Sequence, residues 1–131
     1  MVDARLSLSI LDGLFSICRL EYTPGMAIPG WAQTGEFFSI TRGHGELSIV
    51  CPQGNVPEGT REEPGWKCME LEGPLDFELT GIMSALTKSL ADAGISIFAL
   101  STFNTDFIMV RESDLKGAIL ALTQQGHLVN Q

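Results

Sequence analysis

The pattern of hydrophobic and polar positions changes near the middle of the chain. In the first half, short apolar segments alternate with turns, as in residues 5–11 and 14–20 on either side of Asp12-Gly13. Alternation with a period of two predicts half-buried strands, and an Asp-Gly pair between two such segments predicts a hairpin. Residues 37–42 and 46–51 predict a second hairpin, with His44 exposed at its tip.

Two segments of the first half predict loops. Residues 22–35 hold two prolines and three glycines, which predicts an irregular connection with one short helical turn around Trp31. Residues 52–64 predict a second loop, with a short helix near 58–62.

In the second half the apolar positions recur at helical spacing. Residues 82–93 predict an amphipathic helix, with Thr80 as its N-cap and Gly94 as its stop. A second helix is predicted over residues 114–125, with Ser113 as its N-cap and Gly126 at its end. Strands are predicted at residues 66–71, 75–77, 95–100, 107–110 and 127–129. The segment 95–100 is apolar on both faces, which is typical of a central strand.

The order of these elements predicts the fold class. Strand, helix, strand, strand, helix and strand over residues 66–129 form a ferredoxin-like unit, an antiparallel sheet with both helices on one face. The first half has strands at similar spacing but a loop where the first helix would stand, so we interpret it as a degenerate copy. We therefore expect an α+β protein of tandem ferredoxin-like units, the first over residues 1–63 and the second over 64–131.

Composition narrows the class of protein. The 131 residues carry a net charge of −8, from 16 acidic and 8 basic residues, without a Lys/Arg cluster. This charge disfavours nucleic acid and anionic membranes as partners. Without a membrane-length apolar run or a targeting pattern, we expect a cytoplasmic protein. Cys18, Cys51 and Cys68 lack metal-ligand spacing and lie in apolar segments, so buried reduced thiols are expected.

Several short stretches share a pattern with one known family. They are Gly73-Pro74-Leu75-Asp76-Phe77, Leu79-Thr80-Gly81-Ile82, Leu90-Ala91-Asp92-Ala93-Gly94-Ile95-Ser96, Ser101-Thr102-Phe103-Asn104-Thr105-Asp106-Phe107-Ile108-Met109-Val110, Ser39-Ile40-Thr41-Arg42 and Glu46-Leu47-Ser48-Ile49-Val50. These stretches resemble the ACT domain, a small ligand-binding module of amino-acid metabolism. The likeness is greatest to the ACT repeats of aspartate kinases, to the CASTOR arginine sensors and to small bacterial proteins of two such repeats. It covers nearly the whole chain.

The resemblance also implies a ligand site. In ACT proteins the effector lies at an interface between ACT repeats. The loop after the first strand offers backbone N–H groups to an amino-acid carboxylate, and a Ser-Thr-Phe-x-x-Asp turn contacts the other end. The positions that match are Gly81, Ile82, Thr102, Phe103, Thr105 and Asp106. The animal arginine sensors tend to carry an aromatic residue where Thr105 stands, so the resemblance does not extend to arginine as the ligand.

Elementary physical chemistry is consistent with this ligand site, but it also gives these residues roles that need no ligand. The N-terminus of a helix at Gly81 has unpaired N–H groups and a partial positive charge, which suit a carboxylate. Asp106 suits an ammonium or guanidinium group. The alternatives that need no ligand are capping by Thr80-Gly81, turn formation by Asp106 and core packing by Phe103.

The sequence thus favours a non-enzymatic regulatory protein that binds a small molecule, most plausibly an amino acid. Neither a cofactor nor a metal is implied, and we expect a homodimer or a regulated enzyme as partner. One alternative is an interaction module without a working ligand site. The other is a small enzyme that uses Cys51 or His44, for which the sequence supplies no partner residues.

Overall fold

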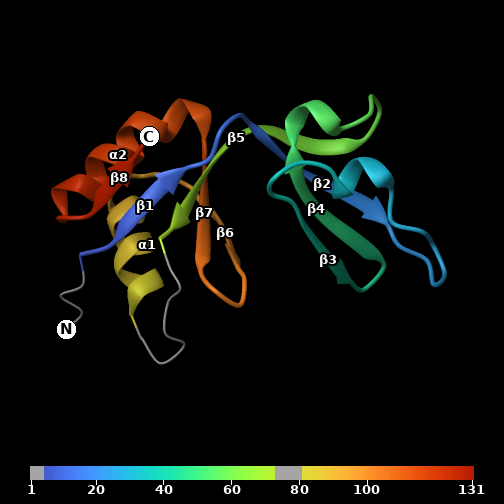
Figure 1. The fold of residues 1–131 in the computed structure, drawn as a ribbon, viewed down its shortest axis with the longest axis horizontal. Coiled ribbons are helices and arrows are strands. Elements are labelled where there is room, and N and C mark those ends of the chain that lie inside the picture. The colour runs from blue at the N-terminus through green and yellow to red at the C-terminus, as the bar shows by residue number, and fades with distance from the viewer. Residues whose placement is uncertain (1–4, 73–80) are drawn as a thin grey trace. The chain divides into compact units, whose positions relative to one another are not determined.

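The computed structural model describes residues 5–72 and 81–131, which form two compact units. The helical unit contains the described residues of Met1–Asp12 and Lys67–Gln131, and the loop-covered unit is Gly13–Trp66. Figure 1 shows their elements along the chain. Strand β5 (Arg61–Leu71) belongs to the loop-covered unit at its start and to the helical unit at its end. This division differs from the predicted one chiefly in the first twelve residues, which were expected in the first unit.

The sheet of the helical unit has the ferredoxin-like order with one extra strand. A ferredoxin-like unit places its fourth strand beside its first, followed by its third and second. Here the N-terminal strand lies between the fourth strand and the first, antiparallel to the first and parallel to the fourth. In order across the sheet the strands are β8 (Leu128–Asn130), β1 (Ser7–Ile10), β5, β7 (Asp106–Arg111) and β6 (Phe98–Ser101).

The position of β1 corrects the first predicted hairpin. Leu8 lies opposite Leu71 of β5 and beside Val129 of β8, so β1 does not pair with the strand that follows it. The Asp-Gly signal is nevertheless a real turn signal, because Gly13 has a φ of 80°. A local turn motif cannot exclude pairing with strands that are distant in sequence, and burial of Leu8 in the core favours those distant strands.

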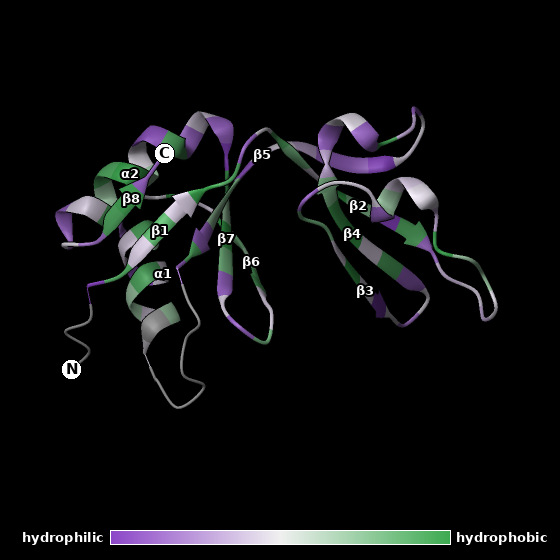
Figure 2. Ribbon diagram, in the orientation of Figure 1, coloured by the Kyte–Doolittle hydropathy of each residue, from purple (hydrophilic) through white to green (hydrophobic). Residues whose placement is uncertain are grey.

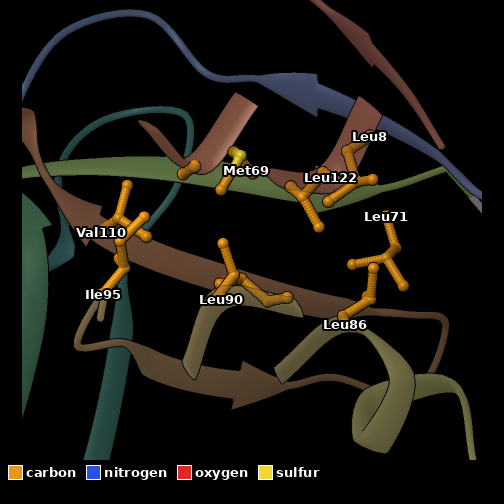
Figure 3. Close-up of a cluster of buried hydrophobic side chains, with 10 residues drawn as sticks. Leu8, Met69, Leu71, Leu86, Leu90, Ile95, Val110 and Leu122 are labelled. Carbon is orange, nitrogen blue, oxygen red and sulfur yellow. The ribbon is translucent and has the colours of Figure 1, made fainter. Parts of the chain in front are cut away.

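Two helices cover one face of this sheet. They are α1 (Ile82–Asp92) and α2 (Leu115–Gln124), both close to their predicted bounds. Figure 3 shows Leu86 and Leu90 of α1 and Leu122 of α2 meeting Met69 and Leu71 of β5. These side chains are fully buried, and each contributes about 1.5–3 kcal/mol to folding through burial of apolar surface.

The helix starts differ from those predicted. Thr80 lies outside the described residues, and Gly81 occupies the N-cap position of α1 with a left-handed φ of 80°. At α2 the predicted cap Ser113 lies inside a short 3-10 turn, η3 (Glu112–Asp114), and Asp114 takes the N-cap position without a side-chain hydrogen bond. The turn replaces the cap because backbone bonds within it already satisfy part of the helix start. Gly94 ends α1 as predicted, with a φ of 75°.

The predicted central strand at 95–100 is wrong, both in the residue at which the strand begins and in its place in the sheet. Strand β6 begins only at Phe98, and within residues 5–72 and 81–131 it pairs with β7 alone. The segment is apolar for a different reason. Ile95 is 9% exposed and packs in the core at the end of α1, with Ile97 beside it.

The loop-covered unit repeats the strand order without long helices. Its order is β3 (Ser39–Gly43), β4 (Glu46–Pro52), β2 (Phe15–Glu21) and the start of β5, all antiparallel. Short 3-10 turns, η1 (Gly30–Gln33) and η2 (Gln53–Asn55), lie in its connections. The short helix predicted near 58–62 is wrong, because these residues form a turn and the start of β5. Trp31 and Ala32 of η1 pack on Cys18, Ile49 and Cys51.

The hydropathy of the strands agrees with this one-sided cover. Bands of hydrophobic and hydrophilic residues alternate along β2 and β4 in Figure 2.

The second predicted hairpin is confirmed, with Gly43 opposite Glu46 and His44 exposed at the tip. The fold class is therefore α+β, with tandem ferredoxin-like units of which the first lacks its helices. Among the residues that the structure describes, no helix has the length and hydropathy needed to cross a membrane.

Candidate ligand site

The turn between β6 and β7 is held by two threonines. The N–H of Thr102 donates to the carbonyl of Thr105 at 2.8 Å, and the N–H of Thr105 donates back to Oγ1 of Thr102 at 3.3 Å. Thr105 is 7% exposed, and its own Oγ1 donates to the carbonyl of Leu71 at 2.7 Å. This last bond fixes the turn against the end of β5. Thr105 therefore has a structural role that the sequence alone did not reveal.

Asp106 begins β7 directly after this turn. It lies opposite Ser101 of β6, whose hydroxyl donates to Oδ1 of Asp106 at 2.5 Å. Side chains alternate along a strand, so Asp106 shares a sheet face with Ile108 and Val110. Both of those residues belong to the core beneath the helices. The carboxylate is thus half-buried on the helix-covered face, with one oxygen oriented by Ser101.

Gly81 and the backbone of Ile82 form the start of α1. The carbonyl of Gly81 accepts the first helical bond, from the N–H of Ala85 at 2.9 Å. The N–H groups of the first helical turn have no partners within the helix. Figure 3 places Leu86 beside Leu71 and Leu90 farther back along β5, so α1 begins at the end of the sheet where β5 ends. The β6–β7 turn lies at the same end, because Thr105 bonds to Leu71.

Phe103 is the clear departure from the sequence-based alternatives. Its side chain is 81% exposed, so the core role considered for it is wrong. It stands in a four-residue turn closed by Thr102 and Thr105, which directs the two intervening residues away from the sheet.

Sequence reasoning missed one polar residue of this group. Ser101 was part of the family-like motif but was not expected to act, and it is the residue that orients Asp106. The signal for it is the cross-strand register, which pairs residues 101 and 106 across the turn. Local sequence does not reveal that register until the turn length is known.

The three cysteines are buried, as predicted. Burial raises the pKa of Cys18 to about 12 and that of Cys68 to about 12, and it also raises the pKa of Cys51. A thiol acts as a nucleophile only as the thiolate, so these environments oppose cysteine catalysis. Within residues 5–72 and 81–131, no group of three or more His, Cys, Asp or Glu residues is arranged to hold a metal ion.

Comparison with known proteins agrees with the fold. A family model of the ACT domain matches residues 61–124, which include α1, the β6–β7 turn and α2. A second family model, of an N-terminal domain, matches residues 13–59 and begins at the first residue of the loop-covered unit. Residues 61–124 therefore belong to the ACT domain family.

Solved structures give the same result. The crystal structure of a protein from Agobacterium tumefaciens is 42% identical, with a TM-score of 0.88, and the match covers 96% of this chain and 92% of that one. Two more distant matches show the fold alone. The regulatory subunit of aspartate kinase from Thermus thermophilus has a TM-score of 0.64 at 8% identity, over 91% of this chain and 96% of that one. Aspartate kinase from Clostridium acetobutylicum has a TM-score of 0.67 at 13% identity, over 92% of this chain and 34% of the kinase.

Proposed function

We propose that this protein is a non-enzymatic regulator that binds a free amino acid at the end of the helical unit where α1 begins. The carboxylate of the ligand meets the N–H groups of Gly81 and Ile82, and its cationic group meets Asp106. Thr102, Phe103 and Thr105 form the wall of the site in the β6–β7 turn. Occupancy is reported through self-association or through binding to a regulated enzyme in the cytoplasm.

The observation that supports the proposal most directly is the bond from Thr105 to the carbonyl of Leu71. It holds the turn at the end of the sheet where α1 starts, so a donor group and an acceptor group of opposite character lie at one end of one unit. A helix start favours an anion, and a carboxylate favours a cation, which together match the two ends of an amino acid. Membership of the ACT family is consistent with the same place.

A thermal-shift screen of the twenty amino acids tests the proposal. A ligand present at 100 times its dissociation constant stabilises the folded protein by about 2.7 kcal/mol, which raises the melting temperature by several degrees. Asp106→Asn removes the charge but keeps an oxygen that accepts from Ser101. We expect this variant to keep its unliganded melting temperature and to lose the shift.

Asp92→Asn is the matched control, because it removes one carboxylate from an exposed pair with Lys88 on α1. It should retain the full shift. Failure of every amino acid at millimolar concentration would reject the amino-acid class and favour the interaction module. A shift that survives in Asp106→Asn would show that the ligand binds elsewhere.

A further inference from the structure

The sheet of the loop-covered unit packs beneath η1 on one face, and its other face is apolar at Phe15 and Val50 and polar around Arg19. Side chains on the covered face, such as Cys18 and Ile49, pack beneath η1. The other face holds a hollow of about 310 Å³ over β2, β4 and β5. The side chains of this polar face around the hollow are Ile17, Arg19, Glu46, Ser48, Arg61 and Glu63.

A row of hydrogen-bond donors crosses this hollow. Arg19 of β2 lies opposite Ser48 on one side and opposite Arg61 on the other. Thr41 of β3 extends the row, because it lies opposite Ser48. Residues directly opposite in antiparallel strands share a face and have Cβ atoms about 5 Å apart. Two hydroxyls and two guanidinium groups are thus aligned across four strands.

The two arginines of the row differ in their partners. Like charges directly opposite one another destabilise a sheet. Arg19 is paired with Glu21 along its own strand, at 2.6 Å from Nη1 to Oε1. Arg61 forms neither an ion pair nor a side-chain hydrogen bond with any residue in 5–72 or 81–131. An exposed guanidinium without a partner, directly opposite a second arginine on the neighbouring strand, favours an anionic group between them.

A carboxylate without a partner stands next to this row. Glu63 lies two residues from Arg61 on the same face of β5, opposite Ile17, which places the two residues about 7 Å apart along the strand. Within the described part of the chain, Glu63 likewise forms no ion pair. Glu46 is less available to a cationic ligand group, because it lies opposite Glu21 and close to Arg19. The hollow therefore presents a cationic end and an anionic end that do not neutralise each other.

We propose that this hollow is a second binding site, for a small zwitterion that carries a carboxylate and an amine. The carboxylate lies between Arg19 and Arg61 with a hydrogen bond from Ser48, and the ammonium group lies at Glu63. The site is in the loop-covered unit and does not depend on the proposed site at α1. An inorganic anion satisfies only the arginine end, and the carboxylate of Glu63 repels it.

Amide NMR spectra of the nitrogen-labelled full chain test this site. The probes are glycine, β-alanine and γ-aminobutyrate, with acetate, methylammonium and inorganic phosphate as single-ended probes. We expect a zwitterion to move the amide signals of Arg19, Ser48 and Arg61 to saturation, with an affinity at least several-fold above that of each single-ended probe. Arg61→Gln should weaken that affinity about ten-fold, as loss of a charge-assisted pair does. Arg61→Lys should restore part of it.

Arg42→Gln is the matched control for the loss of one guanidinium. Arg42 is on β3 of the same unit, opposite Leu47 on the covered face, and stacks over Tyr22 at 5.1 Å. The Arg42→Gln variant should bind the zwitterion with an affinity within about two-fold of that of the wild type. Glu63→Gln provides a second variant, which should lower affinity for the zwitterion and raise it for acetate.

Three outcomes overturn the inference. The first is an absence of movement in the hollow with all three zwitterions. The second is binding of phosphate or acetate as tight as that of the best zwitterion. The third is an affinity unchanged by both Arg61→Gln and Glu63→Gln. Signals of the β6–β7 turn report the other proposed site in the same spectra, so each site can fail without the other.

Discussion

The two units of this protein share a strand order and differ in what covers their sheets. When the strands of each unit are numbered along the chain, both sheets have the fourth strand near the first. The third strand follows the first, and the second strand comes last. In the helical unit α1 and α2 cover one face, and ten described residues form its buried core. In the loop-covered unit a Pro- and Gly-rich segment takes that place, and its Ala32 is buried against Cys18, Ile49 and Cys51 of the sheet. Strand pairing is thus preserved while the cover changes.

The two covers differ in the size of the side chains that they bury. The helices bury large side chains such as Leu86, Leu90 and Leu122. The loop buries Ala32 completely and Trp31 in part, over the thiols of Cys18 and Cys51. Cross-strand pairs add to the stability of the sheet beside this apolar cover. The shallow cover also leaves polar groups close to the core, such as Ser16, which donates to Glu62 at 2.6 Å.

The largest expected effect comes from the deeper core. Leu90→Ala removes a fully buried side chain from the contact between α1 and the sheet. We expect the free energy of unfolding to fall by about 2–5 kcal/mol, measured by chemical denaturation. Leu120→Ala on α2, where the side chain is 58% exposed, should change it by less than about 0.5 kcal/mol. Equal costs for the two variants would contradict the assignment of the helix faces.

A smaller and more local effect is expected under the loop. Ala32 has no exposed surface, so Ala32→Leu overpacks the space between η1 and the sheet at a cost of about 1–3 kcal/mol. Hydrogen exchange should show lower protection in β2, β3 and β4. Ala27→Leu, at an exposed position of the same segment, serves as the control. If Ala32→Leu is as neutral as Ala27→Leu, then the loop is not a packed cover.

The smallest effect concerns pH at the N-terminal strand. His127 is 6% exposed, and its Nδ1 accepts the N–H of Leu6 at 3.1 Å, so the ring is neutral with its proton on Nε2. Burial lowers the pKa of His127 from its usual 6.5. At pH values just below 6.5, the His127 imidazole of the unfolded chain binds a proton, whereas the buried imidazole of the folded chain stays neutral. Stability is therefore complete above this window and falls as the pH falls through it.

Melting temperatures measured from pH 7.5 to 5.5 test this dependence. In His127→Asn the side-chain oxygen accepts from Leu6 and does not titrate, so the decline should be shallower than in the wild type. His44→Asn, at the exposed hairpin tip, should retain the full decline. Parallel curves for wild type and His127→Asn would show that this bond does not couple protonation to folding.

Much of the helical unit was predictable because its signals are local. The periods of α1 and α2, and the stop at Gly94, depend on residues within a few turns of one another. The likeness to the ACT family also predicted the fold of this unit. Local signals failed where a distant segment competes. The turn at Gly13 does not close a hairpin, and the apolar segment after Gly94 serves the core before it becomes β6.

The sequence by itself determined the two long helices, the ferredoxin-like order of its second half, the buried thiols and the likeness to the ACT domain. Only the tertiary structure decided the insertion of β1 between β8 and β5, the exposure of Phe103, the bond from Thr105 to Leu71 and the alignment of Arg19 with Arg61. The physical reason is range. Helix periods and turns are set by neighbouring residues, whereas strand partners and their register are selected by burial of the whole sheet face, which joins residues that are far apart along the chain.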